Sequence, residues 1–351
     1  MAAILFLSLN LFFSSFVTIT LASSSSSPTI ASDQLKFWSE NVNNKMPKPI
    51  LNKLSPLTQK DSDYYNNLLF SKNSKFSADA KFCTLAKLAC TSFFDDVKQV
   101  KETYTTEKTY AKLSADLHRQ QSGIKTEDPF SFFRMSVLKN GNLVHLPHLQ
   151  ETLPDRAFLP EKMASRIPLN YTAISRIFPD SDVTGKTKAT IQTTLGYCNA
   201  AAIRGETKSC PRSLEEMVGF ARVTLGGGGD KKKVVALTSK STVGSNSIAK
   251  IGKIKEYGGG AGEKIVACHE AFLPFAAYYC HLLTSTRLYM VDFVDRETGS
   301  KVVNMMLGIC HMDTSHWPKE HVAFKILKFG PGEGEACHWF TQLDLAWISN
   351  V

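Results

Sequence analysis

A cysteine-histidine dipeptide occurs four times in the last quarter of the chain, and it limits how this part of the chain can fold. Gaps of ten, twenty-eight and twenty-five residues separate Cys268-His269, Cys280-His281, Cys310-His311 and Cys337-His338. Successive side chains of a β-strand point to opposite faces, so each dipeptide in a strand directs its sulfur one way and its imidazole the other. We therefore expect sulfurs that oxidise in pairs within the core, and four imidazoles that gather on the other face as a nitrogen-rich metal site.

The chain holds eight cysteines, an even number that is typical of a protein oxidised in the secretory pathway. Their spacing suggests two local loops, one with Cys83 and Cys90 and the other with Cys198 and Cys210. The four cysteines of the dipeptides allow three pairings, and the sequence does not choose among them. Since no cysteine is left over, the unpaired reactive thiol that a cysteine protease needs is not expected.

The N-terminus predicts export. Residues 3–21 form an apolar run, and small residues around Ala22 suit cleavage, so we assign residues 1–22 to a signal peptide. No basic residue precedes Lys36, and a membrane anchor is the alternative interpretation. We expect a protein secreted to the apoplast, the cell wall or the vacuole, with no stable membrane span after signal removal. Asn170 begins the single glycosylation motif.

Composition divides the rest of the chain into a leader and a domain. Residues 23–128 begin Ser-, Asn- and Pro-rich, which predicts an extended leader to about residue 50, and the charged residues 95–128 predict an exposed linker. Between them, apolar spacing before Cys90 predicts a small helical turn closed by a disulfide. Residues 129–351 predict a single β-rich α+β domain.

Local patterns place several elements in that domain. Ser213 and Glu216 form a capping box for one clear helix. The rest of the domain is predicted to consist of strands. The dipeptide Asn140-Gly141 indicates a hairpin turn. Two strand pairs are predicted, residues 287–295 with 301–311, and residues 322–329 with 337–347.

Copper is the metal that the four histidines favour. Zinc sites usually leave two to four residues between paired ligands, and oxidising export removes the thiolates they use. Imidazoles without thiolate suit copper(II), which stands above zinc in divalent affinity. The competing interpretation is that the histidines merely pack beside disulfides. His321 is a fifth candidate ligand or proton-transfer group, ranked above His316.

Other patterns narrow the class of partner. No GxSxG, HExxH or P-loop pattern occurs in the chain. The net charge of +9 suits an acidic partner, which for an exported protein favours a polyanionic wall polysaccharide over nucleic acid.

These residues together resemble the plant BURP domain. Four Cys-His pairs, the last followed by eight residues and Trp347, match its C-terminal signature, and Phe132-Phe133, "FLP" at 158–160 and "GPGEGEACHWF" support it. The leader "FWSENVNNKMPKPILNKLSPL" and "KFCTLAKLAC" resemble the branch of polygalacturonase non-catalytic beta-subunits. The second gap is longer than expected for the family, and the Phe-x-x-Tyr repeats of the beta-subunits are nearly absent.

The resemblance implies two different activities. One is a copper-dependent peptide cyclase, for which His269, His281, His311 and His338 would hold copper (Cu2+) as ligands and catalytic residues, and dioxygen would be the oxidant. Its substrate would be a separate ribosomal precursor peptide (RiPP biosynthesis), cross-linked at Tyr or Trp. The other is a non-catalytic cell-wall protein that binds pectin or a polygalacturonase. The resemblance also implies that Cys268, Cys280, Cys310 and Cys337 form disulfides. We take the cyclase as the leading hypothesis and the wall protein as the alternative.

Overall fold

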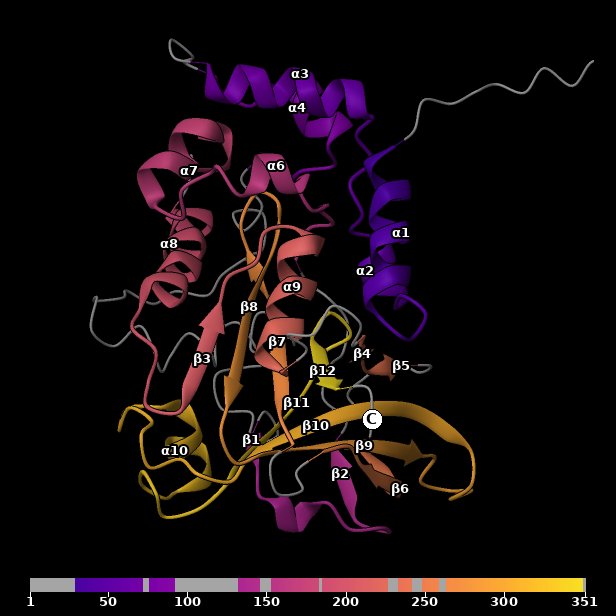
Figure 1. Ribbon diagram of the computed structural model, residues 1–351. Coiled ribbons are helices and arrows are strands. Elements are labelled where there is room, and N and C mark those ends of the chain that lie inside the picture. Colours follow the sequence, from indigo (N-terminus) through magenta and orange to yellow (C-terminus); the bar gives the residue numbers. More distant parts are fainter. Residues whose placement is uncertain are drawn as a thin grey trace, which may run out of the picture.

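The computed structural model describes residues 29–71, 76–91, 132–145, 153–182, 185–226, 233–241, 248–258 and 263–349 (Figure 1). The expected signal peptide and the charged linker at 95–128 lie outside these ranges. Among the helices of the described ranges, none combines the length and the apolar character that crossing a bilayer requires.

The described chain begins with helices and ends in sequence dominated by strands. The helices are α1 (Ile30–Asn41), α2 (Lys48–Leu51), α3 (Gln59–Phe70), α4 (Ala80–Leu85), α6 (Glu161–Ala164), α7 (Tyr171–Ile177), α8 (Gly185–Asn199), α9 (Leu214–Thr224) and α10 (Val322–Leu327), with 3-10 turns η1 (Met135–Val137) and η2 (Pro179–Asp182). The strands are β1 (Phe132–Phe133), β2 (Leu143–His145), β3 (Glu206–Ser209), β4 (Val234–Leu237), β5 (Lys240–Ser241), β6 (Ile248–Glu256), β7 (Ile265–Phe272), β8 (Ala276–Leu283), β9 (Thr286–Val294), β10 (Val302–His311), β11 (Ala336–Trp339) and β12 (Leu345–Ser349).

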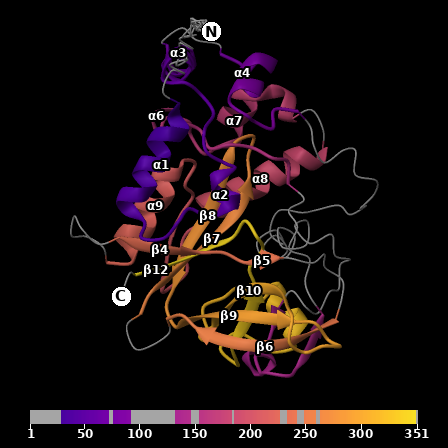
Figure 2. The ribbon, with the colours of Figure 1, turned by 90° about the vertical axis from the view of Figure 1, so that its right-hand side faces the viewer.

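The strands form two antiparallel sheets. The first, which we call the upper sheet, has the order β3-β8-β7-β12-β4. The second, the lower sheet, has the order β1-β11-β10-β9-β6-β2, with β5 also paired to β10. Figures 1 and 2 show the long strands β7 and β8 running across the direction of β9 and β10, with most helices around the upper sheet. The predicted β-rich α+β fold is confirmed.

Three apolar layers hold the sheets in place. One lies between the sheets, where Ala267 and Ala346 of the upper sheet meet Leu307 and Ile309 of the lower sheet. On the other face of the upper sheet, α1 and α9 pack over Val266, Cys268, Cys280 and Trp347. On the other face of the lower sheet, the chain between β1 and β2 covers Phe293, Cys310, Cys337 and Trp339. Burial of apolar surface on both faces of each sheet is the main stabilising contribution to this architecture.

Two sequence predictions within the domain are confirmed. The side chain of Ser213 accepts a hydrogen bond from the Glu216 N–H, and α9 follows it with Leu214, Met217 and Val218 buried. Strands β9 and β10 form the predicted hairpin, which carries His311 at the end of its second strand.

Three other predictions are wrong. Residues 322–327 form the helix α10 instead of a strand, because a short apolar run does not distinguish the two, and the His321 side chain caps it through the Ala323 N–H. Asn140-Gly141 does form a turn, but its strands do not pair with each other: β1 pairs with β11 and β2 with β6. The structure forms the helices α7 and α8 in sequence for which strands are predicted.

The N-terminal segment, which we define as residues 29–71 and 76–91, is helical and packs on the domain, unlike the extended leader that the sequence predicts for residues up to about 50. The Trp38 ring of α1 lies 5.6 Å from the Trp347 ring of β12. The Asn44 side chain bonds both the N–H and the carbonyl of Ala236, at 2.9 and 2.8 Å. The Lys87 carbonyl accepts a 2.8 Å hydrogen bond from the Ala157 N–H, just after α4. The segment therefore forms packed helices because of its spaced aromatic and apolar residues, although its polar composition predicts an extended chain.

A buried ionic cluster fastens this segment to β7. The Lys53 ammonium lies 2.6 Å from Oε1 of Glu270, and the Arg156 guanidinium lies 3.0 Å from the same oxygen. The side chains of Arg156 and Glu270 are fully buried, and Lys53 is 4% exposed. A carboxylate is stable at such a site only when cations and hydrogen bonds replace its water.

We predict that Glu270→Gln costs about 3–5 kcal/mol in the free energy of unfolding, since it leaves two buried cations without an anion. Lys53→Met is the matched control and should cost clearly less, because the Glu270–Arg156 pair stays intact. Urea unfolding of the three proteins measures both losses. Equal losses for the two variants would contradict the proposed charge balance.

Candidate functional site

The four Cys-His dipeptides sit in two pairs of neighbouring strands. Cys268 of β7 is directly opposite Cys280 of β8, and Cys310 of β10 is directly opposite Cys337 of β11. Each pair forms a disulfide with a Cα–Cα distance of 4.0 Å. The other two disulfides join Cys83 with Cys90 and Cys198 with Cys210, as the spacing suggests, and no described cysteine is free. Eight cysteines in four bridges indicate folding in an oxidising compartment.

The four histidines meet between the two sheets. The centroids of the rings lie 5.5 Å apart for His269 and His281, and 6.1 Å apart for His281 and His311. The cycle closes with 5.6 Å between His311 and His338 and 5.5 Å between His338 and His269. We call this set the histidine cluster. The side chains of His269 and His281 are 15% and 12% exposed, whereas His311 and His338 are buried, so the upper-sheet side of the cluster is its accessible side.

Oxygen atoms outside the cluster face Nδ1 of two of these rings. Oδ1 of Asp344 lies 3.3 Å from Nδ1 of His269, while its Oδ2 accepts a 2.8 Å hydrogen bond from the Thr341 N–H. Oε1 of Glu206 lies 3.4 Å from Nδ1 of His281, an ion-pair distance that does not meet hydrogen-bond geometry. A carboxylate facing Nδ1 favours the proton on that nitrogen, which leaves Nε2 with its lone pair.

The hydrogen-bond network assigns the same tautomer to His311. The Thr286 hydroxyl donates to the Leu283 carbonyl at 2.9 Å, so its oxygen accepts at 3.3 Å from His311 Nδ1–H. Burial, together with the neighbouring His281 and His269, holds the pKa of His311 well below its usual value. His311 is therefore a neutral ring near pH 7, the form in which histidine binds a metal.

Glu206 is ionised throughout the physiological range. Burial alone would raise the pKa of its carboxyl, but contacts with His281 and with the Tyr279 hydroxyl outweigh it and lower the pKa to about 2. For His281, burial is the largest effect and lowers the pKa despite the nearby carboxylate. The sequence does not indicate three of these residues, because they belong to no motif and lie far along the chain from the histidines that they contact. They are Glu206, Asp344 and Thr286.

The structure places the two further histidine candidates outside the cluster. Nδ1 of His321 accepts the Ala323 N–H at 3.2 Å, so the neutral ring carries its proton on Nε2 and offers no lone pair to a metal. Its ring lies 4.3 Å from Trp317, which in turn lies 5.3 Å from His311. Trp317 thus separates His321 from the cluster. His316 is exposed on the turn before α10.

The four rings offer imidazole nitrogens, which copper and zinc accept as ligands, but as they lie they stand slightly too far apart to hold one ion. Four imidazole nitrogens about 2 Å from one ion hold neighbouring ring centres roughly 5 Å apart, slightly less than the separations in the cluster. Accordingly, in the described part of the chain no three His, Cys, Asp or Glu side chains already stand at metal-binding separations. The sulfurs are oxidised and point to the outer faces, so they take no part in such a site.

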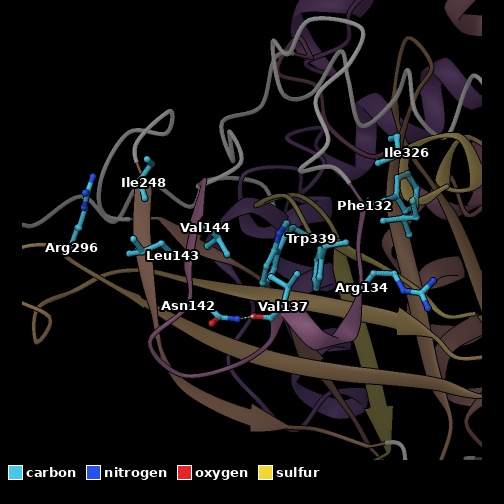
Figure 3. A pocket seen from close by; sticks show the side chains of 12 residues that line it. Phe132, Arg134, Val137, Asn142, Leu143, Val144, Ile248, Arg296, Ile326 and Trp339 are labelled. Carbon is cyan, nitrogen blue, oxygen red and sulfur yellow. Dashed lines mark hydrogen bonds between the residues drawn. The ribbon is translucent and has the colours of Figure 1, made fainter.

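An apolar hollow of about 760 Å³ lies elsewhere on the lower sheet (Figure 3). Its Phe133 and Trp339 belong to the layer that contains Cys337, on the face opposite the histidines. Figure 3 shows Arg134 and Arg296 at opposite ends of the hollow, and Arg134 pairs with Glu335 at 2.9 Å. Most of the hollow therefore lies on the face opposite the histidines, but Phe132, which also lines it, has its ring 5.7 Å from that of His338.

Asn170, the expected glycosylation acceptor, is exposed and caps α7 by accepting the Ala173 N–H. Its modification stays a prediction.

Comparison with known proteins identifies the family of this two-sheet domain. The BURP domain model matches residues 131–349. The chain belongs to the BURP domain family. BURP domain-containing protein 16 of Oryza sativa subsp. japonica is 31% identical over 320 residues, covering 90% of this chain and 88% of that protein. The Polygalacturonase-1 non-catalytic subunit beta of Solanum lycopersicum is 36% identical over 258 residues, covering 71% of this chain. The match spans 40% of the length of that relative.

We predict that replacing Cys310 and Cys337 of this BURP domain by serine lowers the free energy of unfolding by about 3.5 kcal/mol, from the loop entropy of a 27-residue separation. The same change at Cys83 and Cys90, which are 7 residues apart, should cost about 2.4 kcal/mol. Guanidinium unfolding measures both losses. A smaller loss for the Cys310–Cys337 pair than for the Cys83–Cys90 pair would show that the entropy of loop closure does not determine which disulfide contributes more to stability.

Proposed function

We propose that this BURP-domain protein is a non-catalytic protein of the cell wall that associates with pectin or with a polygalacturonase. The observation that carries this proposal is its 36% identity to proteins named polygalacturonase non-catalytic subunits. Glycoside hydrolysis commonly uses two carboxyl groups that face the sugar. The carboxylates beside the histidine cluster instead serve as histidine partners, and Asp344 is fully buried. This arrangement supports a role without hydrolysis of its own.

Surface charge supports an acidic partner. Lys253 and Lys255 are exposed on β6, and Arg296 and Lys301 are exposed in the turn between β9 and β10. Strand β9 is the neighbour of β6 in the lower sheet, and the exposed carboxylates of Glu256 and Glu297 lie among these four cations. We call these four residues the basic strip. Together with the net charge of +9, it suits the carboxylates of demethylated pectin.

We predict that demethylated pectin retains the protein in a salt-sensitive manner, because screening weakens contacts between exposed charges. Lys253→Glu with Lys255→Glu should reduce retention more than Lys36→Glu with Lys60→Glu, a control with the same net charge on exposed helical positions. The salt concentration for elution from a pectin column measures the effect. His269→Ala should elute like the wild type. Absence of retention on pectin and of binding to a polygalacturonase would refute this function.

The histidine cluster favours a second candidate function. We propose that His269, His281, His311 and His338 bind a copper ion, and that the protein oxidatively cross-links a Tyr or Trp side chain in a separate precursor peptide. Copper would supply one-electron oxidation, and dioxygen would take up the two electrons and two protons removed per cross-link. The chain's own contribution is to position the four rings through the two cross-strand disulfides and to shield two of them from water. The partial exposure of His269 and His281 supports access for a peptide side chain.

We predict that the metal-stripped protein binds one equivalent of Cu(II), and that His311→Ala weakens binding strongly while His316→Ala leaves it unchanged. Titration with Cu(II) against a competing chelator measures the affinity. In the presence of dioxygen, Tyr- or Trp-ended peptides should become about 2 Da lighter, the mass of two hydrogens. Equal affinities for the two variants would refute the proposed metal site. A copper-loaded protein that leaves a broad set of peptides unchanged would refute the proposed cyclase activity.

A further inference from the structure

Glu206 lies on the accessible side of the histidine cluster, on the edge strand of the upper sheet. Its strand β3 pairs with β8, where Lys208 is opposite His281 and Ser209 is opposite Cys280. The Cys198–Cys210 disulfide closes the loop that contains Glu206, with a sequence separation of 12. The backbone at Glu206 is thus held on one side by the ladder and on the other by a covalent bridge.

Both oxygens of the Glu206 carboxylate have partners. Oε1 accepts a 2.6 Å hydrogen bond from the Tyr279 hydroxyl, and Oε2 accepts a 3.0 Å hydrogen bond from the Ile203 N–H. Tyr279 lies two residues before His281 on the same face of β8, and the two rings are 5.1 Å apart. The same Oε1 faces Nδ1 of His281 at 3.4 Å, and the Glu206 side chain is only 7% exposed.

A similar arrangement exists at His269 on the neighbouring strand, where the contact of the carboxylate with Nδ1 is a hydrogen bond of 3.3 Å. There, Asp344 offers one oxygen to Nδ1 of His269 and uses the other for a backbone N–H. In both cases the carboxylate is itself hydrogen-bonded to a backbone N–H, and it faces Nδ1 of the ring instead of Nε2. Carboxylates in this relation to histidine orient the ring and raise its basicity as a ligand.

We propose that Glu206 is a positioning residue of the histidine cluster: anchored by Tyr279 and by the Ile203 N–H, it holds His281 with Nε2 presented to a metal ion. The proposal rests on the second candidate function, since it concerns a metal at the same four rings. Glu206 itself does not contact the ion. It acts through His281, and its effect must disappear when that imidazole is removed.

A purely structural role for Glu206 makes a different prediction. If the carboxylate only stabilised the edge strand, its loss would lower the stability of the metal-free protein and affect metal binding regardless of His281. If it positions His281, its loss should change the affinity and the coordination of the ion only while His281 is present. A double-mutant cycle separates these two roles.

The experiment uses the full secreted chain and Cu(II) alone as the probe. Glu206→Leu should weaken Cu(II) binding about 10- to 100-fold in chelator competition. Glu206→Gln keeps an acceptor oxygen without the charge and should lose less. Thr207→Val is the matched control, because Thr207 is exposed on the same strand, and it should bind as the wild type does. In the His281→Ala background, adding Glu206→Leu should change nothing further.

Electron paramagnetic resonance of the Cu(II)-loaded proteins gives an independent readout. Glu206→Leu should show the loss or displacement of one nitrogen ligand, as His281→Ala does, while Thr207→Val retains the wild-type spectrum. If Glu206→Leu does not fold, the same comparisons with Glu206→Gln decide the question. Unchanged affinity and spectrum in the Glu206 variants, or an equal loss in the His281→Ala background, would overturn the inference. A wild-type protein that binds no Cu(II) would instead refute the metal site on which it rests.

Discussion

Side chains alternate between the two faces of paired β-strands, and this alternation determines where the disulfides and the histidines lie. Because cysteines directly opposite each other form disulfides on one face, the adjacent histidines must lie on the other face of the same strand pair. Two such pairs, one in each sheet, then bring their histidine faces together across the interior. The outer faces, with their disulfides, are covered by the helices α1 and α9 and by the chain between β1 and β2.

Three consecutive residues of β7 connect the covalent, ionic and histidine parts of this architecture. Cys268 joins β8, His269 faces the cluster, and Glu270 accepts the ion pairs of Lys53 and Arg156 on the outer face. The N-terminal segment therefore reaches the back of the strand that carries the first histidine. The packed unit of this chain extends beyond residues 131–349, the range of the family model, since Lys53 and Trp38 contribute buried contacts to it.

The sequence predicted what depends on local pattern. The helix cap at Ser213, the β9–β10 hairpin and the separation of sulfur from imidazole follow from neighbouring residues, and the structure contains all three. The other half of the predicted capping box is absent, because the Glu216 carboxylate accepts from the Arg212 N–H instead of the Ser213 N–H. Residues 322–327 were mispredicted because a short apolar run suits a helix as well as a strand. The contacts of Glu206 and Asp344 with the histidines join residues 75 positions apart in each case, and no local pattern encodes such a contact.

Four imidazoles from two sheets meet in one cluster, and all four neighbouring sulfurs are oxidised and lie on the opposite faces. Whether this cluster is the proposed copper site can be measured by anomalous diffraction at the copper edge, from crystals of the protein soaked in Cu(II). We expect one strong anomalous peak enclosed by His269, His281, His311 and His338, with both cross-strand disulfides intact. A cluster without copper, or copper bound by a reduced cysteine, would contradict the proposal.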